Sequence, residues 1–298
     1  MRAALILNKN AGTSSDEKDN VDNLKSIFSS YNIKAETFFP EGEEIKKTVK
    51  ELINEDFDIV AAAGGDGTLN SVASVLAGTN MPMGIIPMGT LNHFAKDLGI
   101  PLSAEDAIRL IAEGVPQKVD IGEVNGNIFI NNSSVGLYPK AVKLRDQHIE
   151  QLGRGKWFSM ILAFLSVFTR FPLFDIKLET DDGTIVRRTP FVFIGNNEYK
   201  LDLFNLGTRE TVTGGKLSLY TAHCKGRWSM LKIAILALLN RLDQHKNFDL
   251  QFVDKIRLET RRNIVEVSVD GEVLHLKPPL HYQIRPLNLS VILPREKA

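Results

Sequence analysis

Three of the four residues from Gly64 to Gly67 are glycine, within the stretch Gly64-Gly-Asp-Gly-Thr-Leu-Asn70. The apolar run Phe57–Val60 precedes it, and apolar residues at helical spacing follow it. Glycine leaves backbone amides uncovered, and a helix N-terminus adds unpaired N–H groups and a partial positive charge. This combination suits a phosphate group. We therefore predict a phosphate-binding turn between a strand and a helix; the alternative is a tight turn that needs glycine only for its backbone angles.

Two other polar turns repeat this arrangement. The turn Asn8–Gly12 follows the aliphatic run Ala3–Leu7, and the turn Met88-Gly89-Thr90 follows the run Met83–Pro87. Ligands of parallel α/β sheets bind beyond the carboxyl ends of the strands. Three such turns at one sheet edge indicate a phosphate site more strongly than any one of them does.

Several common phosphate and metal motifs do not occur in the sequence. Both Gly-Lys pairs lack the Ser or Thr that completes a P-loop, and Asn70 stands where a dinucleotide fingerprint needs its third glycine. There is no zinc-ligand spacing and no protein-kinase catalytic loop. The histidines are scattered, and His93, in the Gly89 turn, is the one whose position could bear on chemistry.

Strands and helices must alternate to place these turns together. Up to about residue 113 the chain reads as a strand followed by a helix, repeated, with strands that are mostly aliphatic runs. Such strands are typical of a parallel sheet covered on both faces. We predict a doubly wound α/β nucleotide-binding domain at residues 1–120, to which the C-terminal segment 287–298 returns.

The pattern changes from about Val119. Short strands follow, with the turn dipeptides Asn125-Gly126, Asp182-Gly183 and Asp270-Gly271, which are typical of antiparallel hairpins. Residues 127–132 read as a single strand. We predict that residues 121–286 form a β-rich, mainly antiparallel β-sandwich domain, interrupted by helices near 156–170 and 228–242.

Composition restricts the class of protein. The 298 residues include 36 basic and 36 acidic side chains, and this balance argues against a generic nucleic-acid binder. Cys224 is the single cysteine, which excludes an internal disulfide and fits a reducing compartment. The longest apolar run, 157–168, is shorter than the roughly 20 residues that span a bilayer. We expect a cytoplasmic protein.

Several blocks, taken in order, resemble the catalytic family of diacylglycerol kinases, which includes bacterial soluble lipid kinases and the eukaryotic sphingosine and ceramide kinases. The blocks are Asn8–Gly12, Gly64–Asn70, Ile86–Pro101, Asn131–Gly136, Gly195–Asn197 and Val269–Glu272. They extend over nearly the whole chain. The Gly-Gly-Asp-Gly-Thr motif alone is shared with NAD kinases and phosphofructokinases, so the ordered set is what makes the resemblance specific.

The resemblance implies ATP- and Mg²⁺-dependent phosphorylation of a hydroxyl of diacylglycerol or a related lipid alcohol, in a cleft between a nucleotide-binding domain and a lipid-substrate domain. The nucleotide-binding residues that it implies are Asn8, Lys9, Asn10, Ala11, Gly12, Gly64, Gly65, Asp66, Gly67, Thr68, Asn70, Thr90 and Asn92. We expect Asp66 to act through the nucleotide Mg²⁺ or to orient its loop; the alternative is a plain helix cap.

The segment Asp270-Gly271-Glu272 reads by itself as a hairpin turn. In the family that the chain resembles, the catalytic acid pair lies at this motif. A lipid hydroxyl must lose its proton as it attacks, and a carboxylate within hydrogen-bond reach can accept that proton. We expect Glu272 to be the proton acceptor, with Asp270 as its neighbour or as a metal contact.

Two positions depart from the family pattern. His93 stands where many bacterial members have Asp, and Gly214 stands where they have a carboxylate that holds a structural Mg²⁺. Because Mg²⁺ needs oxygen ligands, we expect that structural metal site to be lost.

The two apolar helices near 156–170 and 228–242 carry basic residues in or around them. They predict an acyl-chain pocket or a peripheral contact with the inner membrane face; the alternative is a pair of buried helices. Two other functions stay open: an NAD-kinase-like kinase of a soluble small molecule, and a nucleotide- or lipid-binding protein with weak or no catalysis.

Overall fold

The computed structural model describes residues 1–8, 17–136, 173–200, 208–209, 211–222 and 248–295. Three predictions lie outside the described residues: the turn at 9–12 and the helices near 156–170 and 228–242.

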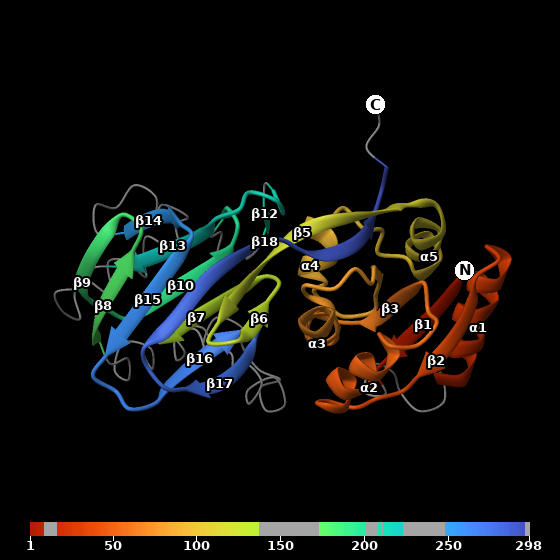
Figure 1. Ribbon diagram of the computed structural model, residues 1–298, viewed down its shortest axis with the longest axis horizontal. Helices are drawn as coiled ribbons and strands as arrows, with labels where there is room; N and C mark the ends of the chain where they lie inside the picture. The colour runs from red at the N-terminus through yellow and green to blue at the C-terminus, as the bar shows by residue number, and fades with distance from the viewer. Residues whose placement is uncertain (9–16, 137–172, 201–207, 210, 223–247, 296–298) are drawn as a thin grey trace, which may run out of the picture.

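The N-terminal half is a parallel sheet with helices on both faces (Figure 1). Its strands have the order β2 (Lys34–Phe38), β1 (Arg2–Leu7), β3 (Ile59–Gly64) and β4 (Met83–Pro87). Every residue of β3 and β4 is buried, which explains why these strands are continuous apolar runs.

Alternate side chains of the strands pack into two separate cores, one on each face of the sheet. Ala4 and Ile6 of β1 pack with α2 (Glu44–Leu52), α3 (Asp66–Leu76) and α4 (His93–Asp97). Ala3 and Leu5 pack with α1 (Glu17–Ser30) and α5 (Ala104–Glu113) on the other face. This is the doubly wound arrangement that the sequence predicted.

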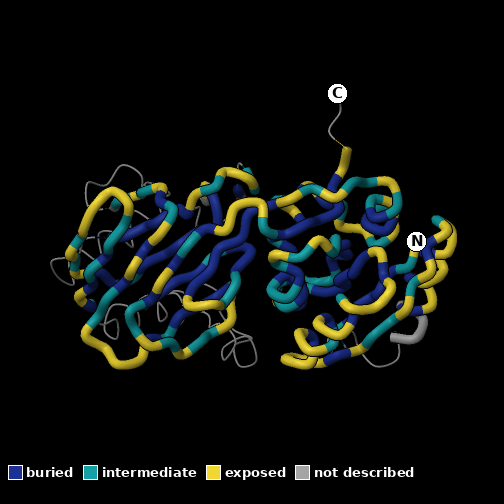
Figure 2. The backbone as a smooth tube through the Cα atoms, in the orientation of Figure 1, coloured by how far each residue is buried: buried dark blue, intermediate teal, exposed yellow. Residues whose placement is uncertain are grey.

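The second half is made of antiparallel strands in two packed layers. One layer is a six-stranded sheet in the order β14 (Phe248–Val253), β13 (Leu217–Ala222), β10 (Phe191–Asn196), β7 (Asn132–Gly136), β16 (Val265–Val269) and β17 (Glu272–Leu276). The other layer holds β8 (Phe174–Thr180), β9 (Gly183–Thr189) and β15 (Lys255–Thr260), which continue the sheet of the first half. A common apolar core joins both layers. Many residues of these strands are buried (Figure 2). The predicted β-sandwich is therefore confirmed.

Two long strands connect the halves (Figure 1). Strand β5 (Val115–Val124) pairs along much of β18 (Leu280–Leu293), and Val291 of β18 pairs with Met83 in the parallel sheet. Leu280–Gln283 of the same strand pair with β15. Because β5 runs through residue 120, no break in secondary structure marks the predicted domain boundary, which stays a prediction.

Residues 127–132 are not one strand. They form β6 (Asn127–Phe129), a turn at Ile130 and Asn131, and the start of β7. The chain turns there because the Asp270 carboxylate binds the backbone amides of Ile130 and Asn131. A short two-stranded ribbon, β11 (Tyr199–Lys200) and β12 (Thr208–Arg209), completes the described elements. None of the described helices is long and apolar enough to cross a membrane.

Candidate active site

The two glycine turns of the parallel sheet lie back to back. A Cβ atom on Gly89 would lie 2.5 Å from the Cα of Gly65, and a Cβ on Gly65 would lie 3.3 Å from the Cα of Gly89. The N–H of Met88 also donates to the carbonyl of Gly64 at 3.0 Å. Position 89 therefore needs glycine because the backbones approach so closely.

Two side chains shape these turns. The carboxylate of Asp66 accepts the backbone N–H groups of His93 and Phe94, at 3.2 and 3.1 Å, and so caps α4 rather than its own helix. Asn92 has a left-handed backbone with φ of 51°. Its side chain accepts from the N–H of Gly89 at 2.9 Å and donates to the Gly89 carbonyl at 2.8 Å. Asp66 and Asn92 thus orient the second turn. Thr90, which lies between Gly89 and Asn92 in this turn, is exposed.

The end of β1 joins the same edge. The side-chain amide of Asn8 donates to the hydroxyl of Thr68 at 3.4 Å. A Cβ atom on Gly64 would lie 2.7 Å from the Thr68 side chain, so glycine lets Thr68 pack against the turn. The described parts of the three predicted turns therefore meet at the carboxyl ends of β1, β3 and β4.

Asp270 is held by hydrogen bonds on every side. Its carboxylate accepts backbone N–H groups of Ile130 at 2.7 Å and of Asn131 and Asn132 at 2.9 Å each. The side-chain amide of Asn70, in α3, is a further donor. Burial raises the pKa of the Asp270 carboxyl above its ordinary value, while these donors oppose the rise. The geometry makes Asp270 an anchor between α3, the 130–132 turn and the β16–β17 hairpin.

Glu272, by contrast, is exposed at the start of β17. Outside its chain neighbours and its own helix backbone, the heavy atom nearest to a Cβ built on Gly67 is Oε1 of Glu272, at 3.8 Å. The predicted phosphate turn and the predicted proton acceptor therefore face each other across the junction of the two halves.

A pocket of about 220 Å³ opens beside them. It is lined by Glu272 and Asn70, by Asn127 of β6, and by Lys46 and Lys50 of α2. The two lysines were not among the predicted site residues, because charged residues on a helix read as a solvated face.

A buried ion pair joins β12 to α4. Nε of Arg209 lies 2.7 Å from Oδ2 of Asp97, and the two side chains are 0% and 2% exposed. Burial raises the pKa of the Asp97 carboxyl, and the Arg209 guanidinium opposes that rise. Arg209 was not predicted, since a single arginine in Gly207-Thr-Arg-Glu has no pattern that distinguishes it from a surface residue.

Beside Gly214, the second departure from the family pattern, a backbone amide binds the carboxylate of Asp120. Asp120 accepts the N–H of Gly215 at 2.7 Å and the N–H of Leu287 at 2.8 Å. A Cβ on Gly214 would lie 3.0 Å from Thr211 and 3.1 Å from Oδ1 of Asn197. The loop at 211–215 is thus tied to Asp120 directly. Loss of the structural metal stays a prediction.

The outer face of the six-stranded sheet combines buried hydroxyls with aromatic rings. Ser134, Ser218 and Ser268 are at most 1% exposed, and their hydroxyls have no hydrogen-bond partner in the part of the chain that is described. Phe193 and Tyr220 lie on the same face with ring centroids 6.0 Å apart. Phe193 and Tyr220 are each 5% exposed, so this face is buried rather than open.

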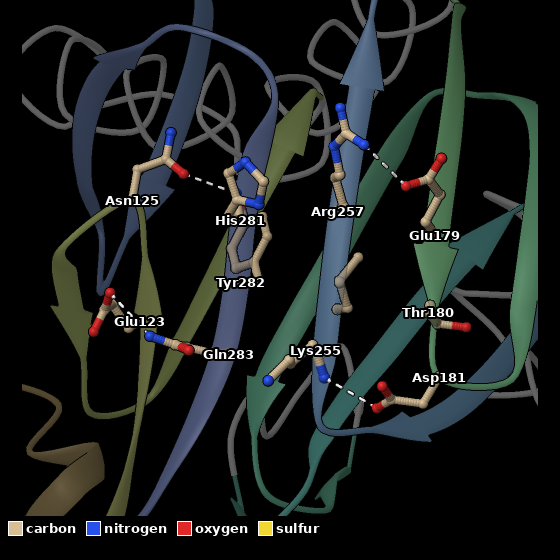
Figure 3. Close-up of a pocket in the computed structure, with 11 residues that line it drawn as sticks. Glu123, Asn125, Glu179, Thr180, Asp181, Lys255, Arg257, His281, Tyr282 and Gln283 are labelled. Atoms are coloured by element: carbon tan, nitrogen blue, oxygen red, sulfur yellow. Dashed lines mark hydrogen bonds and ion pairs between the residues drawn. The ribbon is translucent and has the colours of Figure 1, made fainter.

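A second pocket, of about 380 Å³, lies on the antiparallel part of the first sheet (Figure 3). In this pocket Arg257 pairs with Glu179 at 3.3 Å, and the side-chain amide of Gln283 donates to Glu123 at 3.3 Å. The pocket shares no lining residue with the pocket beside Glu272, so we do not place it in the active site.

The chain is similar to several known proteins. The diacylglycerol kinase catalytic domain family matches residues 2–124. A diacylglycerol kinase of Staphylococcus aureus strain JH9 is 37% identical over 225 residues, which cover 75% of this chain and 70% of that protein. An uncharacterized protein of Synechocystis is 27% identical over 287 residues, 93% of this chain, but the chain spans only 64% of that protein's length.

The same fold occurs in a solved structure. The crystal structure of a diacylglycerol kinase from Bacillus anthracis superposes with a TM-score of 0.71, covering 98% of this chain and 96% of that one. At 20% sequence identity, this likeness shows the fold alone.

Proposed function

Because this chain belongs to the diacylglycerol kinase catalytic domain family, a family of ATP-dependent lipid kinases, we propose that it transfers the γ-phosphoryl group of ATP to a hydroxyl of diacylglycerol or a related lipid alcohol. The observation that carries the proposal is the 3.8 Å distance between a Cβ built on Gly67 and Oε1 of Glu272. This closeness supports a reaction site shared by the predicted phosphate-binding turn and the predicted proton acceptor.

The residues divide the reaction between them. Amides of the turn at 64–68 donate to phosphate oxygens, which favours the charged groups of the nucleotide. Glu272 accepts the proton of the lipid hydroxyl while the hydroxyl oxygen bonds to phosphorus and the bond to the ADP oxygen breaks. Phosphoryl transfer depends mainly on positioning and charge neutralisation. Lys46 and Lys50 bring positive charge to the pocket that Glu272 lines.

The residues near Asp66 fit a nucleotide-borne Mg²⁺ ion. Both Asp66 oxygens accept amides of α4, and each retains a second lone pair. Within the described residues, no group of three or more His, Cys, Asp or Glu side chains is placed to hold a metal ion. One carboxylate plus nucleotide phosphates is a common Mg²⁺ environment. When bound, Mg²⁺ would neutralise phosphate charge.

The family to which the chain belongs supports a lipid acceptor over a soluble one, since its named relatives are diacylglycerol kinases.

An acceptor panel tests the proposal. Purified protein is incubated with radiolabelled ATP and Mg²⁺ and either diacylglycerol in mixed micelles, NAD, or no acceptor, and the products are separated by thin-layer chromatography. We expect label in the lipid alone. Label in NAD would favour the soluble-substrate kinase, and nucleotide binding without label transfer would favour the non-catalytic protein.

A further inference from the structure

The ion pair between Arg209 and Asp97 reaches further than a local contact. Besides Asp97, the Arg209 guanidinium donates from Nη1 to the carbonyl of Ile130 at 2.7 Å and from Nη2 to Oδ1 of Asn131 at 3.4 Å. Its central carbon lies 5.6 Å from the ring centroid of Phe94. One buried side chain thus holds the C-terminal end of α4 and the 130–132 turn together.

The residues that Arg209 contacts are bonded in turn to both parts of the proposed reaction site. Phe94 and Asp97 belong to α4, whose first amides bind the Asp66 carboxylate in the phosphate turn. Ile130 and Asn131 donate their amides to Asp270, two residues before Glu272. The Asn70 side chain closes the path back to α3.

We propose that Arg209 is a positioning residue that fixes the distance between the phosphate-binding turns and the Glu272 turn. The polar path runs from Asp66 through α4 and Arg209 to the 130–132 turn and Asp270, and returns through Asn70. Arg209 and Asn70 are the two links of this path that cross from the first half to the second. The catalytic part of this inference rests on the proposed kinase function; the structural part does not.

The chemistry of the pair fits a role in alignment better than a role in stability. A buried ion pair loses much of its Coulombic gain to desolvation, and an apolar pair of similar size is often equally stable. Lysine cannot replace arginine here, because a single ammonium lacks the planar fork that contacts Asp97, Ile130 and Asn131 together.

A double variant can separate the effect of Arg209 on alignment from its effect on folding. The double variant Asp97→Leu/Arg209→Met removes both charges and so leaves no unpaired buried ion. The Ile130 carbonyl keeps a partner, since the side chain of Asn196 also donates to it at 3.0 Å. The double variant should therefore fold, while the link between the halves is lost.

The test compares the wild type, Arg209→Lys, the double variant and Lys216→Gln. Lys216 forms an exposed ion pair with Asp254, at 2.7 Å and half exposed on both sides, and serves as the matched control. Three readouts are taken: thermal unfolding, hydrogen–deuterium exchange of the segments 128–134 and 268–274, and steady-state kinetics with ATP and diacylglycerol.

For the double variant we expect a near-wild-type unfolding temperature, faster exchange in those two segments only, and a fall in kcat of at least about tenfold. We expect KM for ATP to change by less than about twofold, because the phosphate turns themselves remain. Arg209→Lys should move kcat and exchange in the same direction, and Lys216→Gln should move neither.

Unchanged exchange in both segments would overturn the proposal. A stably folded double variant with the wild-type kcat would also overturn it. If the wild type transfers no phosphate to any lipid, the proposed function fails, and the exchange measurement still decides whether Arg209 aligns the two halves.

Discussion

Replacing Gly67 by alanine separates a functional glycine from a structural one. Gly67 is the second residue of α3, and its φ lies outside the left-handed region, so alanine fits the backbone. Apart from its chain neighbours and the backbone of its own helix, the Cβ would meet no protein atom closer than Oε1 of Glu272, at 3.8 Å, which is ordinary contact. Alanine has the higher helix propensity, worth up to about 1 kcal/mol. We therefore expect the unfolding temperature to rise slightly, by roughly 2 °C.

Activity should change in the opposite direction. The new methyl group points toward Glu272, between the two groups that the proposed reaction would use to hold the γ-phosphoryl group and the lipid hydroxyl. We expect kcat to fall by at least about tenfold, because displacing reacting groups by even 1 Å is costly. Ser71→Ala, in the same helix but outside the pocket, is the control for propensity and should leave kcat unchanged.

Two results would refute this reasoning. Wild-type kcat in Gly67→Ala would mean that the reaction does not take place in the gap between Gly67 and Glu272. A loss of stability would mean that the position is not open to a methyl group, and that Gly67 is required for folding.

Three further predictions follow from the same geometry. Gly89→Ala should destabilise the fold by about 1–3 kcal/mol in chemical denaturation, because its Cβ would lie 2.5 Å from the Gly65 backbone. Gly65→Ala, whose Cβ has its nearest contact at 3.3 Å, should cost clearly less stability. Equal losses of stability would contradict the back-to-back arrangement of the two turns. Lys50→Gln should lower kcat/KM several-fold without changing thermal stability, whereas Lys47→Gln, on a part of α2 that lines a different pocket, should not; equal effects would remove the pocket from the reaction site. The pKa of Asp270 is raised in the folded protein, so its contribution to stability is full below the ordinary value of 3.8 and is lost as the pH rises through the raised value. Asp270→Asn should therefore flatten the pH dependence of the free energy of unfolding in that window. An unchanged slope would contradict the raised pKa.

The parallel sheet and its turns could be predicted because their signals are local. A fully buried strand must be an apolar run, as in β3 and β4, and a turn at the carboxyl end of such a strand must be polar or glycine-rich. The dipeptide Asp270-Gly271 likewise marks its hairpin, with positive φ at both residues. Each of these features depends on neighbours in the chain.

The rest of the site depends on contacts between distant residues. Asp270 could be identified as a residue of interest, but not as the acceptor of the amides of Ile130 and Asn131, which are 140 and 139 positions away. Arg209 and Asp97 are 112 positions apart, and neither has a pattern that points to the other. The turn at Ile130 was read as strand because the run Ile128–Ile130 has strand-favouring residue types, and the Asp270 carboxylate that accepts the amides of the turn is distant in the sequence.

Phosphate transfer by Glu272→Gln tests the central claim most directly. Glutamine has nearly the same shape as glutamate but cannot accept the hydroxyl proton as a carboxylate does. We predict that kcat with ATP and diacylglycerol falls by at least about 100-fold, with ATP binding and thermal unfolding unchanged. Glu266→Gln, on the neighbouring strand of the same hairpin, is the matched control and should keep its activity. Equal kcat values for the two variants would contradict the assignment of Glu272 as the proton acceptor.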